Sequence, residues 1–151
     1  MNKFHEMIKI ADIHIDRINL SINHINHLFP INASMINNIT ENELAWIELF
    51  VSRFGKLQDL LGTKLIDAFL KENEENIDRL TMLDKINKLE RLEIIENAEL
   101  WKEMRNARNH IAHEYPDDPA LTAKYLNQIF YLMPKLINIL DTIKKRSAIQ
   151  N

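Results

Sequence analysis

The segment 108–115, with the sequence RNHIAHEY, contains the residue types in this chain that are best suited to chemistry. Arginine can bind a phosphate through two parallel hydrogen bonds, and a histidine that titrates near neutral pH can donate or accept a proton. On a helical wheel, five residues fall within about 140° of one another and form a basic ridge. They are Arg105, Arg108, Asn109, Ala112 and His113. The pattern therefore indicates phosphoryl chemistry.

The same residues also fit a purely structural role. Arginine, asparagine and histidine near the carboxyl end of a helix can bond its last carbonyls and interact favourably with the negative end of the helix dipole. A cap does not need two arginines and two histidines, but residue types alone leave both interpretations open.

The composition predicts an all-α protein with a single domain over residues 1–151. The chain has only two glycines and four prolines, and 151 residues suit one hydrophobic core better than two. Apolar residues recur at helical spacing in four segments, a cap and a proline bound a fifth, and short turns between such helices favour antiparallel neighbours. We expect an antiparallel bundle of about five helices with a four-helix up-and-down core.

Cap signals and prolines set the expected helix boundaries. Thr40 and Glu43 form a capping box, Asn97 precedes another helix, and Asp118 stands before a proline that suits a first turn. The expected helices run from residue 4 to just before Pro30, from 40 to about 71, from 81 to 95, from 98 to about 114, and from 119 onward. Among the side chains predicted to face inward are Leu44 in the second helix and Leu83 in the third. Asn37 and Asn38 are expected to mark a loop.

The two glycines of the chain, Gly55 and Gly62, both fall inside the second helix. Seven residues return to the same face of a helix, and a missing side chain lets another backbone or side chain come close. We therefore interpret the pair as a packing feature that admits a neighbouring helix, and not as a phosphate-binding loop.

Charge and composition exclude several classes of function. The net charge of −3 argues against a general binder of polyanions, although a local basic patch can still bind a nucleic acid. The absence of cysteine excludes thiolate chemistry, and no apolar run approaches the length of a membrane span. His24 and His27 lie three residues apart without an evident third ligand, so we expect no metal site and no cofactor. We expect a cytoplasmic protein.

The spacing Arg-Asn-x-x-x-His-x-Tyr, formed by Arg108, Asn109, His113 and Tyr115, resembles the signature of HEPN-domain ribonucleases. Within that superfamily the chain is most similar to HepT-type toxins, which pair with a minimal nucleotidyltransferase antitoxin. The order of two long helices, a short one, the motif helix and a closing helix extends the resemblance over nearly the whole chain. Arg105, Asn106 and His110 also match the first part of the motif.

Only the register that begins at Arg108 has the tyrosine two residues after the histidine. We therefore assign the family roles to Arg108 and His113 and treat Arg105 and His110 as auxiliaries. The resemblance implies metal-independent RNA cleavage, in which a ribose 2′-hydroxyl attacks the adjacent phosphodiester. His113 would be the general base or acid, Arg108 would stabilise the developing charge, and Asn109 would orient its neighbours.

The resemblance also implies two kinds of partner. On one helix, Arg108 and His113 point about 140° apart, so a two-fold pair of motif helices would assemble the site better, and we expect a homodimer. The nucleotidyltransferase partner would attach adenylate to Tyr115 and silence the nuclease. The alternative is a non-catalytic subunit that binds nucleotide or RNA for a nucleotidyltransferase, and a third possibility is a purely structural helical dimer.

Overall fold

A computed structural model describes residues 3–73, 76–111 and 117–150, and within these ranges the chain is helical with no strand. The helices are α1 Lys3–Ile25, α2 Ala33–Asn37, α3 Glu41–Leu60, α4 Ile66–Glu72, α5 Met82–Arg91, α6 Ala98–Ile111 and α7 Pro119–Gln150. A 3₁₀ turn, Asn26–Leu28, follows α1, and a π-helical turn, Leu61–Leu65, joins α3 to α4. The predicted all-α bundle is confirmed.

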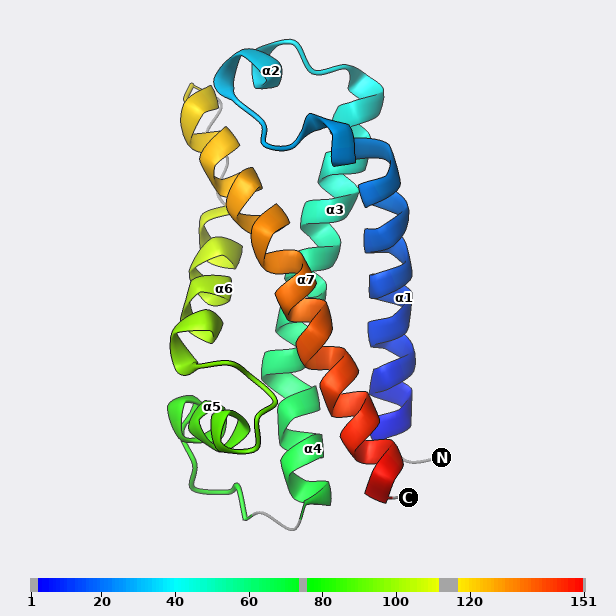
Figure 1. The fold of residues 1–151 in the computed structure, drawn as a ribbon, viewed down its shortest axis with the longest axis vertical. Coiled ribbons are helices and arrows are strands. Elements are labelled where there is room, and N and C mark those ends of the chain that lie inside the picture. The colour runs from blue at the N-terminus through cyan, green and yellow to red at the C-terminus, as the bar shows by residue number, and fades with distance from the viewer. Residues whose placement is uncertain (1–2, 74–75, 112–116, 151) are drawn as a thin grey trace.

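The long helices run up and down the bundle, as Figure 1 shows. α1 rises from the end of the molecule where both termini lie, and α3 and α4 descend beside it. The short α5 turns the chain at the lower end, α6 rises again, and α7 crosses back down over the bundle. None of the described helices combines the length and the apolar character needed to cross a lipid bilayer.

The predicted caps are present where the sequence places them. The Thr40 hydroxyl accepts a hydrogen bond from the Glu43 amide at 3.1 Å, and the Glu43 carboxylate accepts one from the Thr40 amide at 3.0 Å. Asn97 accepts a hydrogen bond from the Leu100 amide, and Asp118 accepts one from the Leu121 amide. These short-range bonds satisfy amides that a helix start leaves without partners, so they fix where α3, α6 and α7 begin.

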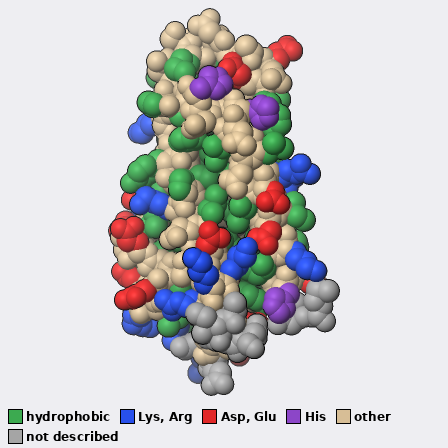
Figure 2. Space-filling view, turned by 45° about the vertical axis from the view of Figure 1, so that its right-hand side comes forward, with side chains coloured by type: hydrophobic (Ala, Val, Ile, Leu, Met, Phe, Trp, Pro, Cys, Tyr) green, Lys and Arg blue, Asp and Glu red, His purple; other side chains and the backbone are tan. Residues whose placement is uncertain are grey.

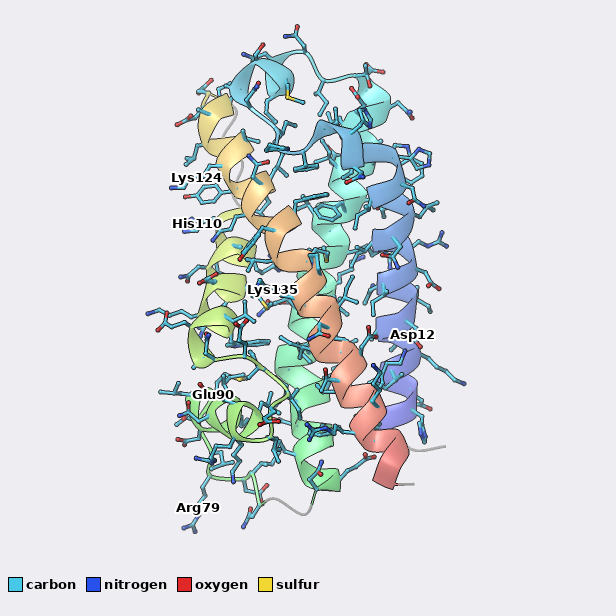
Figure 3. All side chains as sticks on the ribbon, in the orientation of Figure 1. Asp12, Arg79, Glu90, His110, Lys124 and Lys135 are labelled. Atoms are coloured by element: carbon cyan, nitrogen blue, oxygen red, sulfur yellow. The ribbon has the colours of Figure 1, made fainter. Side chains whose placement is uncertain are left out.

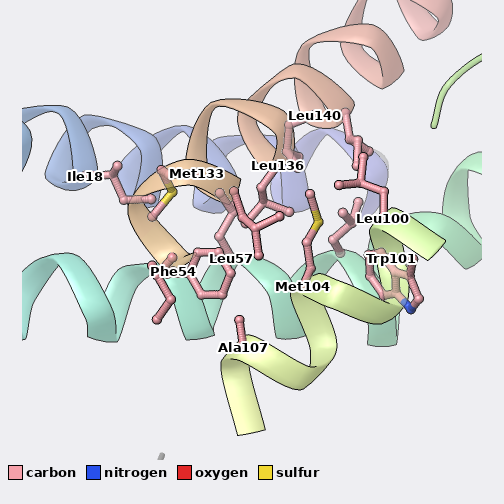
Figure 4. Packing of buried hydrophobic residues seen from close by; sticks show 14 of the residues in the cluster. Ile18, Phe54, Leu57, Leu100, Trp101, Met104, Ala107, Met133, Leu136 and Leu140 are labelled. Carbon is pink, nitrogen blue, oxygen red and sulfur yellow. The ribbon is translucent and has the colours of Figure 1, made fainter. Parts of the chain in front are cut away.

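The core lies where α1, α3, α6 and α7 meet. Phe54 and Leu57 of α3 are fully buried, and Figure 4 shows Met104 and Ala107 of α6 directed toward the same interior. Because these side chains come from helices far apart in sequence, the core fixes α6 against α3.

Three details differ from the sequence-based expectations. Leu44 and Leu83 are 43% and 62% exposed, so the prediction that they face the core is wrong. Both lie in the first turn of their helices. The segment around Asn37 also contains a short helix, α2, capped by Asn32, whose side chain accepts from the Met35 amide.

The third expected helix also stops early, since α5 ends at Arg91 instead of Ile95. Glu93 has a φ of 60°, which breaks the helix. The Ile94 amide then donates to the Leu89 carbonyl at 2.9 Å, and the Glu93 amide donates to the Glu90 carbonyl at 3.0 Å. This is a Schellman motif in which a glutamate occupies the position that usually holds glycine. It lets Ile94 and Ile95 turn back into the core, where both are buried.

Candidate functional site

The described part of the predicted motif lines a pocket between α6 and the α3–α4 helix. Arg105, Arg108 and Asn109, on the last two turns of α6, form one side of this pocket, whose volume is about 380 Å³. We call it the arginine pocket. The rest of its lining consists of Gln58, Asp59, Gly62, Thr63, Met82 and Trp101. The structure therefore brings together three of the predicted site residues.

The two glycines explain how α6 reaches this position. A Cβ added to Gly55 would lie 2.7 Å from Arg108 Nε, and one added to Gly62 would lie 3.1 Å from the Trp101 ring. The first distance is shorter than side chains tolerate, so glycine at position 55 is what admits the Arg108 side chain. The prediction that the glycine pair admits a neighbouring helix is confirmed, and the helix is the one that carries the motif.

Arg108 is held in place by an ion pair with α3. Its Nη2 atom donates a hydrogen bond to Asp59 Oδ2 at 3.1 Å, and the two side chains are 32% and 55% exposed. Its Nε atom is buried and has no hydrogen-bond partner among the described residues. Because an ion pair this exposed contributes only about 0–1 kcal/mol, a phosphate can compete with Asp59 for the guanidinium.

The local charge differs from the charge of the whole chain. The lining of the arginine pocket contains two arginines and one aspartate, a local balance of +1, whereas the chain carries −3. On the face that Figure 2 shows, which is turned toward α1 and away from α6, basic and acidic side chains are interspersed. The charges that line the arginine pocket favour an anionic ligand there.

The wall opposite Arg108 includes part of the π-helical turn. Gly62 and Thr63 belong to that turn and line the arginine pocket. Single π-helical turns inside α-helices occur frequently at functional sites. Sequence reasoning missed Gln58, Asp59 and Thr63 as site residues, and the only signal for this wall was the position of Gly62.

A second, adjoining cavity of about 520 Å³ lies between α5 and α6, and we call it the α5–α6 groove. It shares Met82, Trp101, Arg105 and Asn109 with the arginine pocket. Its remaining lining residues are Leu83, Ile86, Ala98, Glu99, Lys102 and Asn106. The two cavities therefore meet along α6.

His110, the other predicted auxiliary, does not line the arginine pocket. Its ring stacks on Tyr125 of α7, with centroids 4.5 Å apart and an angle of 7° between the ring planes. Figure 3 shows it beside Lys124, near the beginning of α7. Of the two auxiliaries, Arg105 thus lines the pocket, and His110 is exposed and stacks on α7.

The last described residue of α6 is Ile111. Ala112, His113, Glu114 and Tyr115 lie outside the described residues. The roles expected for His113 and Tyr115 stay predictions.

The histidines of α1 have other contacts. His24 stacks on Trp46 with ring centroids 3.9 Å apart, and His27 lies 3.4 Å from Glu43. Within residues 3–73, 76–111 and 117–150, no group of three His, Cys, Asp or Glu side chains could hold a metal ion.

His14 is a buried imidazole on α1. Arg53 Nη1 lies 3.0 Å from His14 Nδ1, an arrangement in which the guanidinium donates to the ring nitrogen. Burial lowers the pKa of His14, and the positive charges of Arg53 and Lys56 lower it further. His14 therefore favours its neutral form and has a structural role.

No protein-family model matches this chain, and no curated protein or solved structure matches it either. The functional argument rests on its own residues.

Proposed function

We propose that the chain is a metal-independent ribonuclease of HEPN type, acting as the toxin of a toxin–antitoxin pair. The observation that carries the proposal is the convergence of Arg105, Arg108 and Asn109 on one pocket with a positive local charge. Two guanidiniums and an amide beside one cavity suit a phosphodiester, because each can donate hydrogen bonds to its oxygens. In the sequence, His113 follows Asn109 by four residues.

In the proposed reaction, His113 removes the proton from a ribose 2′-hydroxyl, whose oxygen attacks the neighbouring phosphorus. The bond from phosphorus to the 5′-oxygen breaks, and a histidine returns a proton to that oxygen. The products are a 2′,3′-cyclic phosphate and a 5′-hydroxyl end. Arg108 stabilises the negative charge that grows on the phosphate oxygens in the transition state.

The proposal includes a homodimer. Five residues separate Arg108 from His113, which on one α-helix is a rotation of about 140°. A two-fold pair of α6 helices brings an arginine of one subunit toward the histidine segment of the other. A nucleotidyltransferase antitoxin that adenylylates Tyr115 would add charge and bulk beside this site.

Cleavage is tested with purified protein and single-stranded RNA in EDTA. We expect degradation that His113→Ala abolishes and that Arg108→Ala lowers by about 10²- to 10³-fold, the usual cost of losing a donor to a developing oxyanion. His110→Ala is the matched control, because His110 lies outside the arginine pocket, and it should lose much less activity. Full activity of the His113→Ala variant would overturn the assignment.

The alternative is a non-catalytic subunit that binds nucleotide or RNA for a nucleotidyltransferase. The Arg108–Asp59 ion pair favours it, because a guanidinium already paired with a carboxylate stabilises a transition state less than a free one does. Binding of RNA without degradation would select this alternative. Mass spectrometry of Tyr115 after coexpression with a nucleotidyltransferase tests the partner in either case.

A further inference from the structure

We propose that the α5–α6 groove holds the base of the RNA nucleotide whose phosphate binds Arg105 and Arg108. This inference rests on the proposed function and adds a base-binding site to it. The ligand class is a nucleotide unit of single-stranded RNA, with its base accessible and unpaired.

The first argument is the continuity of the two cavities. Arg105 and Asn109 line both the arginine pocket and the α5–α6 groove, and Met82 and Trp101 lie along both. The volumes, about 380 and 520 Å³, fall in the range of small-molecule sites. A phosphate in the first cavity thus leaves its nucleoside free to extend into the second.

The second argument is the apolar wall of the groove. Leu83 lines it and is 62% exposed, the largest exposure among the big aliphatic side chains of the described residues. Ile86 of α5 and Ala98 and Trp101 of α6 also line the groove. A base offers two flat, weakly hydrated faces, and covering them with aliphatic or aromatic groups removes apolar surface from water.

The third argument is the polar rim on α6. Asn106 and Asn109 are exposed and line the groove, and an amide both donates and accepts hydrogen bonds, as the edge of a base requires. Arg105 stands where the cavities meet, and a guanidinium plane can stack on a base while its nitrogens bind phosphate. Unpaired bases of RNA are recognised through this combination of stacking and edge contacts.

The fourth argument is a buried donor at the junction. Trp101 is only 6% exposed, and its Nε1 atom has no hydrogen-bond partner among the described residues. A buried donor without an acceptor is costly, and a ligand that brought an acceptor to the junction would relieve that cost. The charges of the groove, Lys102 and Arg105 against Glu99, favour an anionic ligand over a neutral apolar one.

The experiment uses the fluorescence of Trp101. Trp46→Phe leaves Trp101 as the only tryptophan, and Trp46 lines neither the pocket nor the groove. The protein is titrated with adenosine 5′-monophosphate and, separately, with ribose 5-phosphate, which has no base. We expect the nucleotide to change Trp101 emission and to bind at least tenfold more tightly than ribose phosphate.

Leu83→Ser and Leu44→Ser form a matched pair in that background. Both leucines are exposed in the first turn of a helix, but only Leu83 lines the groove. We expect Leu83→Ser to weaken nucleotide binding about fivefold, the effect of losing part of one aliphatic contact, and Leu44→Ser to leave it unchanged. Equal binding of ribose phosphate, or equal effects of the two substitutions, would overturn the inference.

The outcome separates this inference from the proposed function. RNA degradation that depends on His113, together with equal binding of adenosine 5′-monophosphate and ribose 5-phosphate, would refute the base site but not the nuclease. Nucleotide binding that depends on Leu83, without RNA degradation, would establish the base site and refute the nuclease.

Discussion

Replacing Gly55 with alanine tests whether α6 owes its position to that glycine. Alanine inside a helix stabilises it by about 0.5–1 kcal/mol relative to glycine. Here the new Cβ would lie 2.7 Å from Arg108 Nε and 3.1 Å from its Cδ, so the arginine must move. Moving it costs the ion pair with Asp59, about 0–1 kcal/mol, and strains its rotamer by about 0.5–1.5 kcal/mol. The terms nearly cancel, and we expect the free energy of unfolding to stay within about 1 kcal/mol of wild type.

The Arg108→Ala background isolates the contact. Without the arginine, nothing opposes the new methyl group, which gains helix propensity and about 0.8 kcal/mol from burial. Gly55→Ala should therefore raise the free energy of unfolding by about 1.3–1.8 kcal/mol in that background, measured by urea denaturation. An equal gain from Gly55→Ala in both backgrounds would show that Gly55 and Arg108 do not contact each other.

Under the proposed function, RNA cleavage gives a second readout of the same substitution. In enzymes generally, a catalytic group displaced by about 1 Å can cost roughly 10²-fold in rate. We expect Gly55→Ala to lower cleavage by about 10- to 100-fold with little loss of stability. Wild-type cleavage by a folded Gly55→Ala protein would refute the role given to the position of Arg108.

Three further predictions concern charge, backbone and pH. Asp59→Asn removes a negative charge from the arginine pocket. Single-stranded RNA should therefore bind about fivefold more tightly to the His113→Ala protein that carries this substitution, measured by fluorescence anisotropy, because a carboxylate beside a bound phosphate costs about 1 kcal/mol. Unchanged or weaker binding would argue against a phosphate on Arg108. Glu93→Gly relieves a left-handed backbone and should raise the free energy of unfolding by up to about 1 kcal/mol, whereas Glu96→Gly, outside that turn, should not. The pKa of His14 is lowered in the folded state, so the unfolded chain binds more protons, and the stability that neutral His14 provides is lost as pH falls below about 6.5. The His14→Gln protein should therefore lose less free energy of unfolding than wild type between pH 7 and pH 5 in urea titrations. Equal losses in the two proteins would contradict the lowered pKa of His14.

The sequence predicts the parts of this fold that short-range contacts determine. The Thr40–Glu43 box and the caps at Asn97 and Asp118 each join residues three apart, so the sequence alone locates the starts of α3, α6 and α7. The exposure of Leu83 depends on how α5 packs against α6 and leaves a groove between them, and the spacing of apolar residues along α5 carries no information about that packing. The early end of α5 depends on a glutamate that adopts a left-handed backbone, a role for which glycine or asparagine is the usual signal.

The sequence predicts only those residues of the arginine pocket that belong to α6. Arg105, Arg108 and Asn109 are predicted because they share a helix with a recognisable spacing. Asp59 and Thr63 escape prediction because they are ordinary polar residues on a different helix, and they meet Arg108 only through packing. The π-helical turn is missed because its sequence, LGTKL, continues an ordinary helical pattern.

The arginine pocket lies between α6 and the α3–α4 helix, so its shape depends on how these helices pack as well as on the motif. Arg108 lies 53 positions after Gly55, and its guanidinium rests where that glycine leaves space and where Asp59, one turn further along α3, accepts its hydrogen bond. Trp101 makes the second close approach, to Gly62, and so fixes the other end of α6. A chain with the same motif but with alanine at both glycine positions would keep every residue of the signature and still present its arginine differently. Activity in a related sequence should accordingly follow the residues opposite α6 as closely as it follows the motif.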